Sequence, residues 1–183
     1  MRIISGKYKG RKLKIPSNLD IRPTQDRVKE SIFSVLGFQL EQKNILDLFA
    51  GSGSLGLEAL SRGAGRVCFV DKSIGAIKLI KHNIGIVGID RDSYNVIRDD
   101  AERFLKKSSE YHWDIVFLDP PYKISEAKMA KIFGILALGQ IIDKQSIIVY
   151  EYFFKKNIYH EIKKLNIIKE YHYGDKKVSY LKL

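Results

Sequence analysis

Short apolar runs of strand length alternate with helical segments from Asn44 to Tyr150, and this alternation restricts the fold more than any other feature of the chain. The expected strands are residues 45–49, 66–70, 94–97, 114–118 and 146–150, and the expected helices are residues 54–62, 73–84, 100–107 and 126–137. Such alternation is typical of a doubly wound α/β domain, in which helices flank a mainly parallel sheet.

The C-terminal end departs from this alternation. Residues 162–173 and 176–183 have the composition of two strands, and Gly174-Asp175 between them has the composition of a tight turn. We therefore expect an antiparallel hairpin at the edge of the sheet.

The N-terminal end is also different. Ile3-Ile4 and residues 12–16 predict a small β-hairpin around a turn, residues 6–10, that carries Tyr8. Thr24 follows as the expected N-cap of a helix with Val28 and Ile32 on its apolar face. We expect residues 1–43 to form a basic extension and residues 44–183 to form the main domain.

Positive charge is concentrated in this extension. The chain has 183 residues and a net charge of +11, of which residues 1–29 carry +7. A strongly basic balance indicates a polyanionic partner or a basic membrane-binding surface, although charge runs are often no more than solvated termini. Several of these charges alternate with apolar residues, which favours contact with phosphates. Arg27 and Lys29 oppose the dipole of the expected helix, so we expect them to face a ligand or a phosphate.

Other features limit the cellular setting. No apolar run approaches the roughly 20 residues of a membrane span, and the start of the chain lacks the apolar segment of a secretory signal. Cys68 stands alone in an apolar run, so neither a disulfide framework nor a thiolate metal site is expected. The histidines have no ligand spacing, and His82-Asn83 is interpreted as a helix cap. We expect a cytoplasmic monomer without a metal ion.

Four residues after one buried strand carry the clearest chemical signal. Asp119-Pro120-Pro121-Tyr122 follows the apolar run Ile115 to Leu118. The prolines remove two N–H donors and stop the strand, which leaves carbonyl oxygens without partners in the chain. The Asp119 carboxylate and the Pro120 carbonyl can then accept two hydrogen bonds beside the flat ring of Tyr122. A planar group with an exocyclic amine, such as a nucleobase, fits this arrangement.

A glycine-rich loop lies after the first expected strand. Gly51-Ser52-Gly53 opens a helix, so the backbone can approach a ligand closely. By its letters the loop also fits a nicotinamide dinucleotide, but the Asp47 carboxylate before it would repel a pyrophosphate and attract a cationic amino acid end. Asp71 ends the second strand and suits a ribose diol. Asp100 is interpreted as a partner of an adenine amine or, in competition with Asp99, as a helix N-cap. Together these residues indicate S-adenosylmethionine.

The motifs resemble a known family. Asp47-Leu-Phe49-Ala-Gly51-Ser-Gly53, Asp71 and Asp119-Pro-Pro-Tyr122 are similar to those of class I S-adenosylmethionine-dependent amino-methyltransferases. More narrowly, Arg2-Ile-Ile-Ser-Gly-Lys7, Arg22-Pro-Thr24 and Asp26-Arg27 resemble the bacterial 16S ribosomal RNA (guanine-N2)-methyltransferase D family (RsmD). The resemblance covers almost the whole chain.

The resemblance implies a Rossmann-like methyltransferase sheet and methyl transfer to N2 of one guanine of 16S rRNA, in the small ribosomal subunit or its assembly intermediate. It implies that Asp119, Pro120 and Tyr122 are catalytic, and that Asp47, Phe49, Gly51, Gly53, Asp71 and Asp100 bind S-adenosylmethionine. The expected RNA-binding residues are Arg2, Lys7, Lys9, Arg11, Lys12, Arg22, Thr24 and Arg27.

Several alternatives stay open from the residues. Asp119 either accepts the proton that the amine loses or only orients the amine, with the proton lost to water. Glu151 either borders the pocket or is a carboxylate at the edge. The rival functions are an amine methylase of DNA adenine N6 or protein glutamine, a nicotinamide oxidoreductase, and a non-catalytic RNA-binding ribosome assembly factor.

Overall fold

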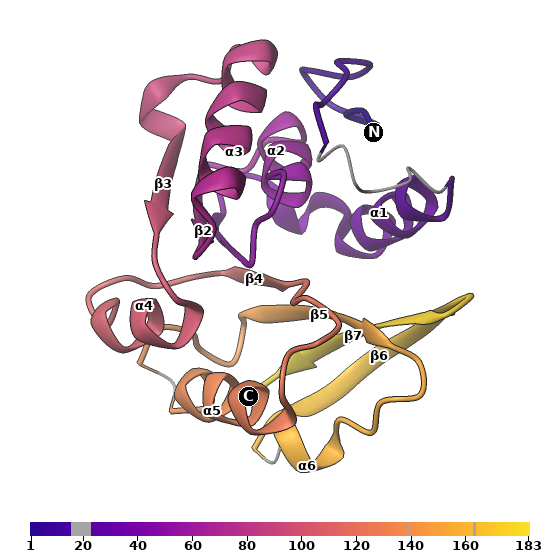
Figure 1. Ribbon diagram of the computed structural model, residues 1–183, viewed down its shortest axis with the longest axis vertical. Helices are drawn as coiled ribbons and strands as arrows, with labels where there is room; N and C mark the ends of the chain where they lie inside the picture. The colour runs from indigo at the N-terminus through magenta and orange to yellow at the C-terminus, as the bar shows by residue number, and fades with distance from the viewer. Residues whose placement is uncertain (16–22, 139, 163) are drawn as a thin grey trace.

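A computed structural model describes residues 1–15, 23–138, 140–162 and 164–183 (Figure 1). Arg22 and the end of the expected N-terminal hairpin at Pro16 lie outside the described residues. Among the described residues, no helix is long and apolar enough to span a membrane.

Seven strands form one sheet in the order β3-β2-β1-β4-β5-β7-β6. Their bounds are Asn44–Leu48 (β1), Arg66–Asp71 (β2), Tyr94–Arg98 (β3), Ile115–Leu118 (β4), Ile147–Phe153 (β5), Asn166–Tyr173 (β6) and Lys176–Lys182 (β7). The first five strands are parallel, and β7 runs antiparallel to both β5 and β6. The predicted Rossmann-like sheet with an antiparallel C-terminal hairpin is confirmed.

Helices cover both faces of this sheet, as Figure 1 shows with the sheet in the middle. The helices on one face are α1 (Pro23–Leu36), α2 (Ser54–Ser61) and α3 (Ile74–Val87), and those on the other are α4 (Ala101–Lys107), α5 (Glu126–Leu136) and α6 (Tyr159–Ile162). Short 3-10 helices η1 (Gly37–Leu40) and η2 (Arg91–Ser93) connect elements. Apolar side chains on each face pack into a separate hydrophobic cluster, since the buried parallel strands have apolar residues on both sides.

The N-terminal segment, residues 1–15, is named the arm below. An antiparallel β-bridge between Arg2 and Lys12 pairs the two extended segments of the arm, and the Ile3 N–H donates to the Arg11 carbonyl at 3.0 Å. Ile3 and Leu13 are buried in the same hydrophobic cluster as α1 and α2. The predicted hairpin is therefore present in a short form, fixed to the body by its apolar residues.

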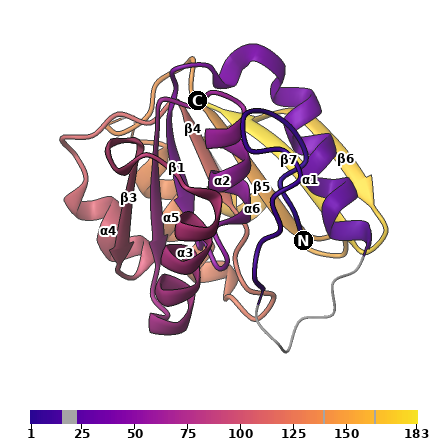
Figure 2. The same ribbon diagram turned by 90° about the horizontal axis from the view of Figure 1, so that it is seen from above.

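One buried carboxylate fixes the arm further. Glu58 of α2 is fully buried, and its two oxygens accept the N–H groups of Ile4 and Ser5 at 2.8 and 3.0 Å. It also pairs with Arg62 at 2.8 Å and with Lys29 at 3.5 Å. The arm consequently lies against α2, as both views show (Figures 1 and 2).

Three local predictions were wrong. Lys29 does not face a phosphate: only 4% of it is exposed, and its ammonium donates to the Arg2 carbonyl at 2.6 Å. Thr24 does not precede the helix, because α1 begins at Pro23. The strand expected to begin at residue 162 begins at Asn166 instead, because Ile158, Ile162 and Leu165 bury their side chains around α6, which ends at Ile162.

Candidate active site

Carboxylates from four strands lie on one face of the sheet at the ends of the parallel strands. Asp47 of β1 is in register with Phe69 of β2 and Phe117 of β4, and Phe117 is in register with Val149 of β5. Paired residues point to the same face, as do residues two apart along a strand. Asp71, Asp119 and Glu151 each lie two positions after one of these partners. All four carboxylates are therefore directed to the face that carries α1, α2 and α3.

The glycine loop after β1 has an unusual backbone that one of these carboxylates holds. Phe49, Gly51 and Gly53 have positive φ values of 71°, 55° and 77°. A positive φ is costly for a phenylalanine and is typical of functional loops. The Asp71 carboxylate accepts the N–H of Gly51 at 3.0 Å and that of Ser73 at 2.8 Å. The sequence predicted these residues at one site, and the structure brings them together.

Asp47 supports the same loop from below. Only 2% of the residue is exposed, and its Oδ2 accepts the N–H of Gly56 at 3.0 Å. Burial raises the pKa of Asp47 to about 7. The hydrogen bond from Gly56 lowers this pKa, and the charge of Asp71 raises it further. A buried carboxylate with a raised pKa gains from a nearby cation. The charge of Asp47 thus suits the cationic end of S-adenosylmethionine. Because the side chain is buried, it acts on that end through its electric field and by holding the loop, and does not touch it directly.

Gly56 is required by the packing of α2 on the sheet. A Cβ at this position would lie 2.3 Å from Cε1 of Phe69. Only glycine allows the helix to come this close to β2, so the start of α2 and the loop before it keep their position above the strand ends.

Asn83 is a site residue that the sequence analysis missed. His82-Asn83 was interpreted as a helix cap, and this is wrong because α3 continues to Val87. Asn83 lies inside α3, fully buried, and its amide donates to the carbonyls of Ser52 and Lys14, both at 2.9 Å. Its side-chain oxygen accepts the N–H of Lys14 at 2.8 Å. The sequence did contain a sign of this role, because Asn83 is a polar residue among the apolar positions Ile80, Ile84 and Val87 of the helix. Asn83 joins the glycine loop to the arm.

The Asp119-Pro-Pro-Tyr motif lies beyond the end of β4 and is open to solvent. Asp119 and Tyr122 are exposed, and 68% of Tyr122 is accessible, so Tyr122 is not a core residue. Within the described part of the chain, no donor is hydrogen-bonded to the Asp119 carboxylate or the Pro120 carbonyl. The two predicted acceptors are therefore free to bind a group from outside the protein.

Glu151 and Lys176 lie beside this motif. They form a close ion pair, and the Lys176 ammonium lies 5.7 Å from the centre of the Tyr122 ring. Surrounding protein atoms and the charge of Glu151 raise the pKa of Asp119, while Lys176 opposes the shift. Of the two open interpretations of Glu151, the structure supports a residue at the border of the site.

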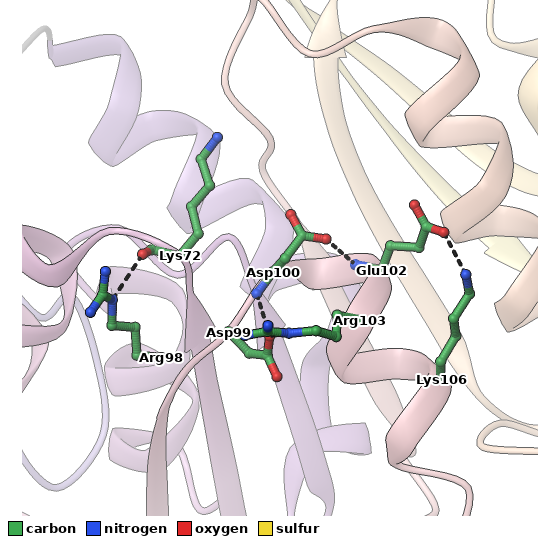
Figure 3. A pocket seen from close by; sticks show the side chains of 7 residues that line it. All are labelled: Lys72, Arg98, Asp99, Asp100, Glu102, Arg103 and Lys106. Carbon is green, nitrogen blue, oxygen red and sulfur yellow. Dashed lines mark hydrogen bonds and ion pairs between the residues drawn. The ribbon is translucent and has the colours of Figure 1, made fainter.

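A hollow of about 740 Å³ borders the positions predicted for ribose and adenine (Figure 3). It is lined by Lys72, Arg98, Asp99, Asp100, Glu102, Arg103 and Lys106. Asp100 caps α4 by accepting the N–H of Glu102 at 3.1 Å, and it pairs with Lys128 at 2.5 Å. Although burial opposes the change, the hydrogen bond and charge of Lys128 lower the pKa of Asp100. The structure thus shows the helix cap, which competed with the adenine contact in the sequence analysis.

The predicted RNA-binding residues occupy different surroundings. Arg2, Lys7, Lys9, Lys12 and Arg27 are exposed. Arg11 is exposed as well, but its guanidinium donates to the carbonyls of Ile86 and Val87 at the end of α3, at 3.0 and 2.7 Å. Arg11 therefore also fastens the arm to the body.

Comparisons with known proteins identify the family. A family model described as "Conserved hypothetical protein 95" matches residues 1–182. The chain belongs to this family. Bacillus subtilis YlbH, provisionally named an rRNA methyltransferase, is 42% identical over 154 residues, which cover 83% of this chain and 82% of that protein. Haemophilus influenzae ribosomal RNA small subunit methyltransferase D is 41% identical over 131 residues, 71% of this chain and 68% of that protein.

Solved structures agree with this assignment. An Escherichia coli protein provisionally described as the methyltransferase yhhF superimposes with a TM-score of 0.84 and 25% identity, covering 100% of this chain and 97% of that chain. The family that the sequence motifs suggested is confirmed, and this chain is a methyltransferase.

Proposed function

We propose that this methyltransferase transfers a methyl group from S-adenosylmethionine to the exocyclic N2 of one guanine in small-subunit rRNA. The observation that carries the proposal is the position of Asp119. Its carboxylate has no hydrogen bond among the described residues, and it lies beside the exposed Tyr122 on the same sheet face as Asp47 and Asp71. The relative named ribosomal RNA small subunit methyltransferase D supports an rRNA substrate.

The chemistry requires a better nucleophile, because the lone pair of a guanine N2 is delocalised into the ring. S-adenosylmethionine, when bound, supplies an electrophilic methyl group. The Asp119 carboxylate and the Pro120 carbonyl accept the two N–H bonds of the amine, and this directs its lone pair toward the donor. The Tyr122 ring stacks on the guanine, which has left its base pair.

The raised pKa of Asp119 favours a role in proton transfer. A carboxylate with a pKa above its ordinary value is a stronger base, so it accepts more readily the proton that the methylated amine loses. The charge of the neighbouring Lys176 opposes this rise of the Asp119 pKa.

The test supplies labelled S-adenosylmethionine with unmethylated small subunits, free 16S rRNA, DNA or a glutamine-containing protein. The expected product is N2-methylguanosine at one position of the rRNA, lost in Asp119→Ala. Label in DNA or protein would overturn the substrate assignment, and cofactor binding without methylation of any RNA would favour the assembly factor.

A further inference from the structure

Exposed aromatic side chains gather beyond the end of β5, next to Tyr122, and apart from Tyr122 none of them has a role assigned above. We name Tyr122, Phe153, Phe154, Lys155 and His172 the aromatic-basic surface. Tyr122, Phe153, Lys155 and His172 are exposed, and Phe154 is half-buried. The residues come from three places in the sequence: the segment after β4, the end of β5 with its following loop, and the end of β6.

The rings contact one another in a continuous row. The ring centres of Phe153 and Phe154 are 5.1 Å apart, and those of Phe154 and His172 are 5.3 Å apart. The Lys155 ammonium lies 5.6 Å from the centre of the Phe154 ring. Backbone bonds hold the row: the Phe154 N–H donates to the Asp175 carbonyl at 3.0 Å, and the Lys156 N–H donates to the Phe153 carbonyl at 2.9 Å. The β6–β7 turn and the loop after β5 thus form one surface at the right of Figure 1.

This surface continues into the candidate active site. Phe153 is in register with Lys176, so the two side chains emerge on the same face of the sheet. Lys176 in turn lies over the Tyr122 ring, at 5.7 Å from its centre. The row therefore starts near the ring proposed to stack on the target guanine. It then passes around the end of the hairpin, because His172 is in register with Lys177 and emerges on the other face of the sheet.

Hydrophobic exposure alone does not indicate a binding site, because single exposed apolar residues are common. Phe38, with 99% of its surface exposed, has no ring contact among those of the described residues and is such a case. The aromatic-basic surface differs, since its rings are adjacent and a cation accompanies them.

The charges around the aromatic-basic surface indicate which kind of molecule it binds. The segment 153–157 contains two lysines and no acidic residue. Lys156 donates to the Tyr150 hydroxyl at 3.3 Å and so anchors the loop, whereas Lys155 is exposed. The Glu151 carboxylate nearby is already paired with Lys176. Rings that accept stacked bases next to a lysine are the features that bind single-stranded nucleic acid.

We propose that the aromatic-basic surface binds the unpaired RNA nucleotides next to the target guanine, with bases stacked on Phe153, Phe154 and His172 and a phosphate near Lys155. This proposal rests on the proposed function, which requires a guanine displaced from its helix. The arm and this surface are then two separate RNA contacts on either side of the reacting base.

The direct test is photocrosslinking of the wild-type protein, with cofactor present, to a 12-nucleotide oligouridylate that contains one 4-thiouridine. Mass spectrometry of the digested protein then locates the crosslinked residues. The proposal expects crosslinks in the peptides that contain Phe153, Phe154 or His172. Crosslinks confined to residues 1–30 would overturn it, as would crosslinks on other parts of the chain.

Variants give a second, kinetic test. Phe153→Ala with Phe154→Ala should raise the KM for small ribosomal subunits roughly tenfold, because stacking on each ring is lost. The kcat should change less than twofold, and the Kd of S-adenosylmethionine should not change. Phe38→Ala is the matched control for loss of an exposed phenylalanine. Lys155→Gln should weaken binding of the oligouridylate and reduce its salt dependence, in contrast to Lys144→Gln, an exposed lysine before β5.

The outcomes separate this proposal from the proposed function. If the wild-type protein methylates rRNA and the double phenylalanine variant keeps an unchanged KM and cofactor affinity, the aromatic-basic surface does not bind RNA. If the wild-type protein methylates no RNA, the proposed function fails, and the crosslinking result still decides whether the surface binds a single strand. A variant that loses cofactor binding has a damaged fold. In that case the crosslinks of the wild-type protein alone decide whether the aromatic-basic surface binds RNA.

Discussion

The side-chain amide of Asn83 donates to the Ser52 carbonyl at 2.9 Å while the same side chain exchanges two hydrogen bonds with the backbone of Lys14. One buried side chain therefore connects the loop that fits the cofactor to the arm that carries the basic residues. We therefore predict that a change in the position of the arm would alter the glycine loop through this amide.

Asn83→Leu should weaken S-adenosylmethionine binding by roughly tenfold and lower the free energy of unfolding by about 1–3 kcal/mol, because buried backbone groups lose their partners. Isothermal titration calorimetry and urea unfolding measure the two effects. His82→Ala, at the exposed neighbouring position on α3, is the control. An Asn83→Leu variant that binds the cofactor within twofold of the wild type would show that the connection has no influence on the site.

Removal of the Glu58 carboxylate should detach the arm. Glu58→Ala leaves Lys29 buried without its ion-pair partner and leaves the N–H groups of Ile4 and Ser5 without an acceptor. Breaking a buried ion pair typically costs about 3–5 kcal/mol, so urea unfolding should show a loss of this size. Trypsin should also cleave earlier at Lys7 and Lys9. Glu110→Ala, at an exposed position, should change neither quantity, and a loss below about 1 kcal/mol in Glu58→Ala would contradict the role given to this carboxylate.

Cofactor affinity should depend on pH through Asp47. Its pKa in the folded protein is about 7, so the carboxylate is mostly protonated at pH 5.5 and mostly ionised at pH 7.5. An α-ammonium with its ordinary pKa of about 7.7–8.0 is fully charged at pH 5.5 and still mostly charged at pH 7.5, so its charge changes less than that of Asp47 over this range. The Kd of S-adenosylmethionine should therefore rise as the pH falls from 7.5 to 5.5, by at most about tenfold per pH unit for one coupled proton.

The free protein should respond to Asp47 in the opposite sense. A folded pKa above the unfolded value of 3.8 means that the folded state binds the proton more tightly, so this residue adds stability as the pH falls from about 7 toward 4. Asp47→Asn should remove both effects, so urea unfolding and calorimetry should show a flatter pH dependence in the variant than in the wild type. An equally steep dependence in the variant would assign the titration to another group.

The succession of strands and helices along the chain and the position of the main motifs could be predicted from the sequence, because apolar periodicity determines the elements and carboxylates at strand ends meet at one edge of a parallel sheet. Asp47, Asp71 and Asp119 were placed together on this basis. The partners of individual side chains could not be predicted in the same way. Lys29 looked like a free cation, but it is buried beside Glu58, and nothing in the spacing of the sequence brings α1 against α2.

The two interpretations of Asp100 show the same limit. An aspartate just before a helix fits both a cap and a ligand contact, and only the positions of Glu102 and Lys128 in space distinguish them. Glu151 was ambiguous for a similar reason, because its partner Lys176 comes from a strand 25 residues further along the chain.

The single-turnover rate of Asp119→Ala tests the central claim most directly, with enzyme in excess, small ribosomal subunits as substrate and N2-methylguanosine as the measured product. The account predicts a rate at least about 100-fold below that of the wild type, because the amine loses a charged acceptor, with an unchanged Kd for S-adenosylmethionine. Asp92→Ala, at an exposed position beside β3, should react at the wild-type rate. An Asp119→Ala rate within threefold of the wild type would contradict the account, because the carboxylate at the end of β4 would then not hold the reacting amine.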